Sequence, residues 1–271
     1  MTLYDVVVVG GGGTGLMAAY AAGKAGARVL VLEKGERLGG TTAMSVGTVA
    51  ASATRLQREN GIDDNPDAHF EDMGLFKPEM ANRDHLGFRR LLVDHAPETI
   101  ALLEEMGVVF MGPLPEPPHR VPRLHAIIPH SRGFIDHLTR ACQTYDVTIK
   151  TGQKVTRLIY EESRVKGVVV DTGAGQEEAI FATRGVVIAS GDFSAAKSDY
   201  KQKFMTGPLL EIGGINPLST GDGQAMGEAV GGEVVNGDLA WGPELRFIAP
   251  KTPSIIARLP TWPSLAKILL Q

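Results

Sequence analysis

The chain has 271 residues, enough to form one large or two small domains around a sizeable core. Its formal net charge of -4 argues against a nucleic-acid-binding surface, and its single cysteine excludes a disulfide framework. The first apolar run follows no basic residue and is interrupted by glycines, so we expect a cytoplasmic α/β protein without a signal peptide or a membrane span.

Residues 5–33 are typical of a dinucleotide-binding unit. An apolar strand leads into a glycine turn, an alanine-rich helix follows, and a second apolar strand ends in Glu33. Gly10 permits a sharp turn, Gly12 lets the backbone approach a pyrophosphate, and Gly15 allows close packing of helix and strand. The helix N-terminus attracts phosphates, and the acid suits a ribose hydroxyl. A glycine turn that only packs a helix on a sheet would not explain where Glu33 stands.

A second glycine loop follows this acid directly and carries hydroxyl side chains. It runs from Lys34 through Gly39 and Gly40 to Thr41, Thr42 and Gly47. Backbone N–H groups and hydroxyls are the donors that phosphates and a polar ring edge need. An ordinary turn can have the same composition, but the position directly after Glu33 favours cofactor binding.

Residues 112–129 form a proline-rich segment that also holds basic side chains. Long loops within compact domains are usually functional or disordered. Two interpretations stay open: a solvated basic loop, or an anion site built from Arg120, Arg123, His125 or Arg132. The histidine spacing matches no pattern of metal ligands, so we predict no metal site.

The second half of the chain predicts several strands. We expect a strand at 147–150, a hairpin of 154–160 and 164–171, a third strand at 179–182, and a buried return strand at 184–191 that enters a glycine turn. This three-stranded insertion differs from the plain doubly wound NAD fold and suits a flavin-binding fold.

A Gly-Asp-Gly turn at 221–223 then begins a short helix. Asp222 is either the N-cap of this helix or a ligand for polyol hydroxyls, and both roles can hold together.

These motifs, in this order, resemble the FAD-dependent family of fumarate reductases, succinate dehydrogenase flavoproteins and ketosteroid dehydrogenases. The resemblance implies a Rossmann-like FAD-binding α/β fold: a parallel sheet flanked by helices, with a small antiparallel insertion. It implies non-covalent FAD, because Thr41 and Thr42 stand where members with covalent flavin carry a His. The implied cofactor residues are Gly10, Gly12, Gly13, Thr14, Gly15, Glu33, Lys34, Gly39, Gly40, Thr41, Thr42, Gly47, Val155 (through its backbone, at adenine), Ala189, Ser190, Gly191 and Asp222.

The implied activity is hydride transfer between flavin and an activated C–C bond of a small molecule, as alkene reduction or dehydrogenation. The segment 241–243 lacks the substrate-binding His of fumarate reductases, which weakens the assignment of a C4-dicarboxylate substrate. Residues 1–240 are expected to form the FAD-binding domain, and 241–271 to begin a substrate-capping domain. The chain therefore resembles a C-terminally truncated fragment, and no catalytic residue or electron partner is assigned. Two alternatives remain. One is an NAD-dependent dehydrogenase, because Glu33 also suits the ribose of NAD, and the other is a non-catalytic FAD-binding fragment.

Overall fold

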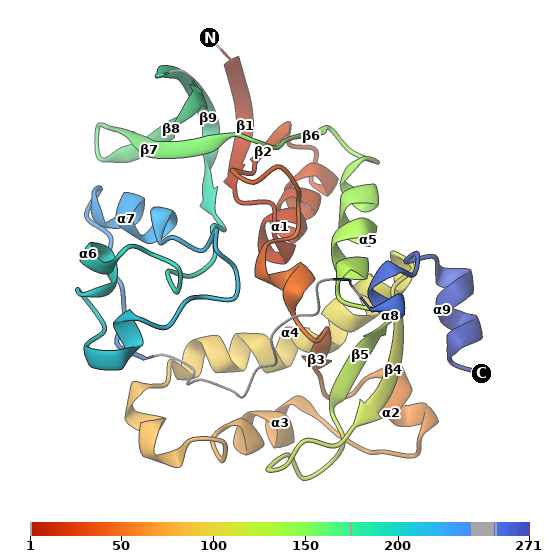
Figure 1. The fold of residues 1–271 in the computed structure, drawn as a ribbon. Helices are drawn as coiled ribbons and strands as arrows, with labels where there is room; N and C mark the ends of the chain where they lie inside the picture. Colours follow the sequence, from red (N-terminus) through yellow and green to blue (C-terminus); the bar gives the residue numbers. More distant parts are fainter. Residues whose placement is uncertain (1, 174, 240–251, 253) are drawn as a thin grey trace. The chain divides into compact units, whose positions relative to one another are not determined.

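The structure is a computed structural model that describes residues 2–173, 175–239, 252 and 254–271 (Figure 1). The chain divides into two compact units, Met1–Met44 with Leu138–Phe247, and Ser45–His137 with Ile248–Gln271. The domain boundary expected at residue 240 falls outside the described residues and stays a prediction. In the part of the chain that the structure describes, none of the helices is both long and apolar enough to cross a membrane.

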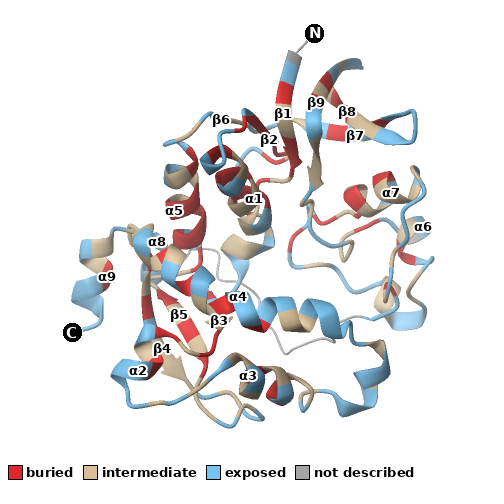
Figure 2. Ribbon diagram, turned by 180° about the vertical axis from the view of Figure 1, so that it is seen from behind, coloured by how far each residue is buried: buried red, intermediate tan, exposed pale blue. Residues whose placement is uncertain are grey.

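The first unit is built on one six-stranded sheet whose strand order is β6-β2-β1-β9-β8-β7. The first four strands are mutually parallel, and β8 and β7 extend the sheet in antiparallel fashion. The strands are β1 (Thr2–Val9), β2 (Val29–Leu32), β6 (Val147–Lys150), β7 (Lys154–Glu161), β8 (Arg164–Gly173) and β9 (Gln176–Ile188). Strand β2 is buried along its whole length, as expected for an apolar strand in the interior of a sheet (Figure 2). The predicted Rossmann-like FAD-binding fold is confirmed.

Strand β9 corrects one prediction. The sequence suggested separate strands at 179–182 and 184–191, but β9 is one continuous strand from Gln176 to Ile188. Its first half pairs antiparallel with β8, while β1 pairs with it in parallel from Ile180 to Ile188. The polar residues that seemed to mark a break, Thr183 and Arg184, lie at an irregularity in the register with β1. The antiparallel insertion and the return strand are therefore one element, and its final residues are half-exposed rather than buried.

Helices of the first unit are α1 (Gly13–Lys24), α6 (Ser198–Lys201) and α7 (Asp222–Glu228), with 3-10 helices at Gly40–Met44 and Gly207–Leu210. Helix α1 packs against the parallel strands through buried residues such as Leu16 and Ala19. Helix α7 lies beside β7 (Figure 1). Helix α5 (Arg132–Cys142) crosses the boundary between the two units.

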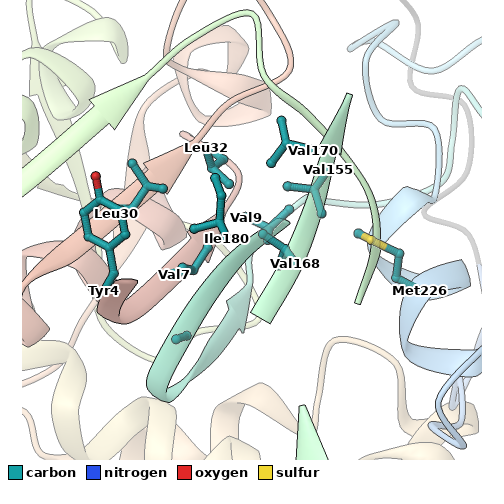
Figure 3. Packing of buried hydrophobic residues seen from close by; sticks show 11 residues of the cluster. Tyr4, Val7, Val9, Leu30, Leu32, Val155, Val168, Val170, Ile180 and Met226 are labelled. Atoms are coloured by element: carbon teal, nitrogen blue, oxygen red, sulfur yellow. The ribbon is translucent and has the colours of Figure 1, made fainter. Parts of the chain in front are cut away.

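One apolar core joins the parallel strands to the antiparallel extension. Figure 3 shows the side chain of Met226, from α7, directed at this cluster. The members are Tyr4, Val7, Val9, Leu30, Leu32, Val155, Val168, Val170, Ile180, Ala182 and Met226. Burial of apolar side chains stabilises the fold by about 25 cal/mol for each Å² removed from water. The core therefore holds α7, through Met226, to the sheet that carries the predicted cofactor turn.

The second unit contains a three-stranded sheet with the order β3-β5-β4. Its strands are β3 (Thr48–Ala50), β4 (Val109–Leu114) and β5 (Leu124–Ile128). Its helices are α2 (Arg55–Glu59), α3 (Pro66–Met73), α4 (Leu86–Glu105), α8 (Ile255–Arg258) and α9 (Pro263–Leu269), with a 3-10 helix at Pro78–Arg83. Strands β4 and β5 occupy much of the segment that the sequence presented as a long loop, so the true connection is residues 115–123.

Candidate cofactor site

Three segments meet where the parallel strands end. Val9 lies opposite Leu32 on one side and Ile188 on the other, so the residues that follow these strands share one edge of the sheet. The N–H of Gly10 donates to the carbonyl of Leu32 at 2.8 Å, and the N–H of Ala189 donates to that of Val9 at 2.8 Å. The carboxyl edge of a parallel sheet is where α/β proteins bind ligands. The predicted residues Gly10, Glu33 and Ala189 are thus brought together.

The glycine turn is tightly packed at two of its positions and open at a third. Gly10 has a φ of +113°, and a Cβ there would overlap the carbonyl of Ala189. A Cβ on Gly15 would overlap the carbonyl of Gly10. At Gly12 a Cβ would meet only the carbonyl oxygen of Gly39, at 3.8 Å. Gly12 therefore leaves the backbone accessible, while the other two glycines are required by packing.

Free donors accompany this open backbone. In the described part of the chain, the N–H groups of Gly12 and Thr14 have no hydrogen-bond acceptor. They lie at the N-terminus of α1, where the helix dipole places partial positive charge. The N–H of Gly13 is engaged by the side-chain oxygen of Thr42 at 3.2 Å. Two free donors, positive potential and an open backbone fit a pyrophosphate, and the residues present therefore fit a dinucleotide.

The carboxylate of Glu33 is held in place by hydrogen bonds from backbone N–H groups. Its carboxylate accepts from the N–H of Gly11 at 2.8 Å through one oxygen and from the N–H of Gly35 at 2.7 Å through the other. The residue is 9% exposed, and each oxygen keeps a further lone pair for a ribose hydroxyl. Gly11 was absent from the predicted set. Its place in the sequence, between Gly10 and Gly12, was the only signal that it would contact Glu33.

The second glycine loop lies against the first turn. The N–H of Gly39 donates to the carbonyl of Gly11 at 3.0 Å, and Gly40 begins the 3-10 helix that carries Thr41 and Thr42. The side-chain amide of Asn216 donates to the Thr41 hydroxyl at 3.4 Å. Gly47 differs from these residues. It belongs to the second unit, where its carbonyl accepts from the N–H of Ile127.

Lys34 connects this edge to the Gly-Asp-Gly turn. Its ammonium donates to the hydroxyl of Thr220 at 2.6 Å and to the carboxylate of Asp222 at 2.7 Å. Burial acts to raise the pKa of Asp222, but the hydrogen bond and charge of Lys34 outweigh it, so the pKa lies below the usual carboxylate value. The helix N-cap is Gly221, with φ 76°, so the N-cap alternative for Asp222 is wrong. Its carboxylate accepts from Lys34 and Thr220.

The remaining predicted residues lie just after β9 or on β7. Ser190 and Gly191 follow Ala189 directly, and the amide of Gln224 donates to the carbonyl of Gly191 at 2.9 Å. Val155 is buried in the core on β7. The chain just before it follows the acid loop, because the N–H of Gln153 donates to the carbonyl of Glu33 at 2.8 Å. Val155 therefore lies two residues along the chain from Gln153, which contacts the Glu33 loop.

Residues 5–252 match the protein family described as FAD binding domain. The chain belongs to this family. Its cofactor is accordingly FAD, and family members are flavin-dependent oxidoreductases. The resemblance to fumarate reductases and ketosteroid dehydrogenases is confirmed.

Individual relatives of this FAD-binding chain are distant. It is similar to the fumarate reductase of Schizosaccharomyces pombe (26% identity, 94% of this chain and 52% of the relative). It is also similar to the 4-oxocyclohexanecarboxylate 2-dehydrogenase of Sinomonas cyclohexanicum (28% identity, 88% and 51%). Among solved structures, the 3-ketosteroid Δ4-(5α)-dehydrogenase of Rhodococcus jostii superposes with a TM-score of 0.73 (25% identity, 85% and 54%). The chain spans about half the length of these proteins.

Two of the basic residues proposed as anion ligands, Arg123 and His125, are buried and engaged by other side chains. Arg123 is fully buried and binds the carboxylates of Asp64, at 2.7 Å, and Asp72, at 2.6 Å. His125 is also buried, with a ring nitrogen 2.8 Å from the hydroxyl of Thr54. The interpretation of Arg123 and His125 as anion ligands is therefore wrong. Within the described residues, no group of three or more His, Cys, Asp or Glu side chains could hold a metal ion.

Proposed function

We propose that this chain is the cofactor-binding part of a flavin-dependent oxidoreductase acting on an activated C–C bond of a small molecule. The observation that carries the proposal is the turn at 10–15, where an open Gly12, two free N–H donors and the braced Glu33 share one sheet edge. Family membership supports FAD over NAD. The relatives include a fumarate reductase and two dehydrogenases that act on carbonyl-bearing rings, which supports the reaction class.

Different residues of the first unit would bind different parts of FAD. The N–H groups of Gly12 and Thr14 would hold the pyrophosphate, and Glu33 would accept from the adenosine ribose. Asp222 would accept from FAD hydroxyls, with its charge maintained by Lys34. When bound, FAD supplies the hydride chemistry, and this chain's residues bind and orient it. No catalytic acid or base is assigned to residues 1–271.

Attachment of the cofactor is proposed to be non-covalent. The positions that would approach the flavin after Gly40 carry Thr41 and Thr42, whose hydroxyls offer hydrogen bonds but no ring nitrogen for a flavin bond. Acid precipitation of the protein should therefore release all flavin into the supernatant. Yellow colour that stays with the denatured chain would contradict this assignment.

Titration of the purified chain with FAD tests the cofactor proposal. We expect quenching of flavin fluorescence that saturates at one FAD per chain and a flavin band in the visible spectrum, with much weaker binding of NADH. Saturable binding of NADH with none of FAD would instead favour the NAD-dependent dehydrogenase.

Activity is addressed separately, with the FAD-loaded chain, reduced viologen and either fumarate or a cyclic enone. Oxidation of viologen that depends on the enone but not on fumarate would identify a substrate class like that of the ring dehydrogenases. No turnover of either compound by a chain that binds FAD would restrict it to the non-catalytic role.

A further inference from the structure

Lys34 is the cation that joins two parts of the proposed site lying far apart in the sequence. Its acceptors, Thr220 and Asp222, come 186 and 188 residues later. The hydroxyl of Thr220 also donates to Asp222 at 3.0 Å, so the three polar groups form a closed set. The side chains of Lys34 and Asp222 are 22% and 26% exposed, so solvent screens this ion pair only in part.

The same region collects negative charge. The segment before Asp222 lies against the loop of Glu33, because Leu218 has a methyl 2.8 Å from where a Cβ of Gly35 would be. That Cβ position is also only 3.1 Å from a carboxylate oxygen of Glu33. The carboxylates of Glu33 and Asp222 therefore belong to segments that meet at the proposed site, and a bound dinucleotide brings the negative charges of its pyrophosphate. Like charges at short range oppose binding unless a cation offsets them.

A second cation, Lys154, also acts on Asp222. Lys154, on β7, also lowers the pKa of Asp222 by its charge, but it does so less than Lys34 and forms no hydrogen bond with Asp222. The anion-attracting N–H groups of α1 carry only partial charge. Among the residues that the structure describes, Lys34 is thus the full positive charge that contacts Asp222 directly.

We infer that Lys34 is a positioning residue for FAD, which orients Asp222 and Thr220 and offsets the charge of the two carboxylates beside the dinucleotide. This inference rests on the proposed function, namely that the turn at 10–15 holds FAD. Because Lys34 acts through Asp222, removing Lys34 should weaken FAD binding most when Asp222 keeps its charge. The prediction is that removing the Asp222 charge partly rescues the loss of Lys34.

The dissociation constant of FAD, measured by fluorescence quenching, tests this coupling in four chains: the wild type, K34M, D222N and K34M/D222N. We expect K34M to bind FAD about ten-fold more weakly, because a partly screened ion pair is lost and a carboxylate is left unpaired. The double variant should bind more tightly than K34M. Lys34→Arg should bind nearly as well as the wild type, because Arg keeps the charge and the donors.

A matched control separates this role from general stability. Lys166 forms a similar ion pair with Glu162, at 2.7 Å, in the β7–β8 hairpin away from the proposed site. Lys166→Met should leave FAD affinity unchanged, and the apo forms of both lysine variants should melt within a few degrees of the wild type. Unchanged FAD affinity in K34M, or a double variant that binds FAD no more tightly than K34M, would overturn the inference. Failure of the wild type to bind FAD would instead overturn the proposed function.

Discussion

Individual glycines in the turn should respond very differently to the same small substitution. A Cβ on Gly12 meets only the carbonyl oxygen of Gly39 at an ordinary contact distance, so Gly12→Ala should fold normally. The added methyl would occupy the open backbone where a pyrophosphate approaches, so FAD affinity should fall by about ten-fold or more. Fluorescence titration with FAD measures this loss, and the far-ultraviolet circular dichroism spectrum should be unchanged.

Two other glycines provide the controls for that substitution. Gly227→Ala, in α7, adds a methyl with nothing within 4 Å and should change neither folding nor FAD binding. Gly15→Ala would overlap the carbonyl of Gly10 and should reduce the yield of folded protein. If Gly12→Ala bound FAD as well as Gly227→Ala does, the pyrophosphate would not approach at this position.

Single residues also show where sequence reasoning succeeds. Gly10, Gly12, Gly15 and Glu33 were predictable because their spacing alone encodes a strand, a turn and a helix, and the structure brings them to one edge. Arg123 was misread because the sequence shows a basic side chain without its partners. The two carboxylates that it binds belong to residues 51 and 59 positions earlier, and no local sequence pattern predicts contacts over such separations.

At the level of elements, Met226 should contribute strongly to the anchorage of α7. Met226 is 5% exposed and packs on the core shared by β1, β2, β7, β8 and β9. Met226→Ala should lower the free energy of unfolding by about 2–3 kcal/mol, because it removes buried apolar contacts and leaves a cavity. Urea unfolding measures this change. FAD affinity should fall as well, since α7 begins at Asp222, and an unchanged affinity would show that Lys34 and Thr220 hold Asp222 without the packing of Met226.

Elements also show the limits of local sequence patterns. Strands β6 and β7 were predictable from alternation and turn residues, whereas β9 was divided in two because Thr183 and Arg184 read as a break. The hydrogen bonds of β1, from the far end of the chain, keep β9 continuous through those residues. Tertiary pairing of this kind overrides local preference, and one sequence does not reveal it.

For the molecule as a whole, acid should destabilise the second unit first. His69 is 2% exposed, and burial together with the nearby Arg123 charge lowers its pKa to about 4. The unfolded chain binds a proton at His69 near pH 6.5 and the folded chain does not, so stability falls as the pH drops from 6.5 to 4. Burial likewise lowers the pKa values of His119 and His125, so both histidines add to the loss of stability as the pH falls below 6.5.

Below that range a carboxylate continues the trend. Burial opposes ionisation of Asp72, but hydrogen bonds from Arg120 and Arg123 hold its pKa at about 2, so its contribution is lost as the pH falls from 3.8 to 2. In the first unit, Asp222 also has a lowered pKa, and among its described groups no buried histidine titrates between pH 4 and 6.5. Unfolding of the chain should therefore separate into two transitions as the pH is lowered, with the second unit unfolding first.

Urea unfolding between pH 7 and 4, followed by circular dichroism, measures this acid sensitivity. In His69→Gln the loss of stability between pH 6.5 and 4 should shrink by on the order of 3 kcal/mol, because a neutral side chain takes up no proton in either state.

His95 is the matched control: its hydrogen bond with Glu98 raises its pKa, so its charge stabilises the fold at low pH. His95→Gln should therefore leave the acid loss at least as steep as in the wild type. An equally steep loss in His69→Gln would show that the buried histidine does not govern the acid stability of the second unit.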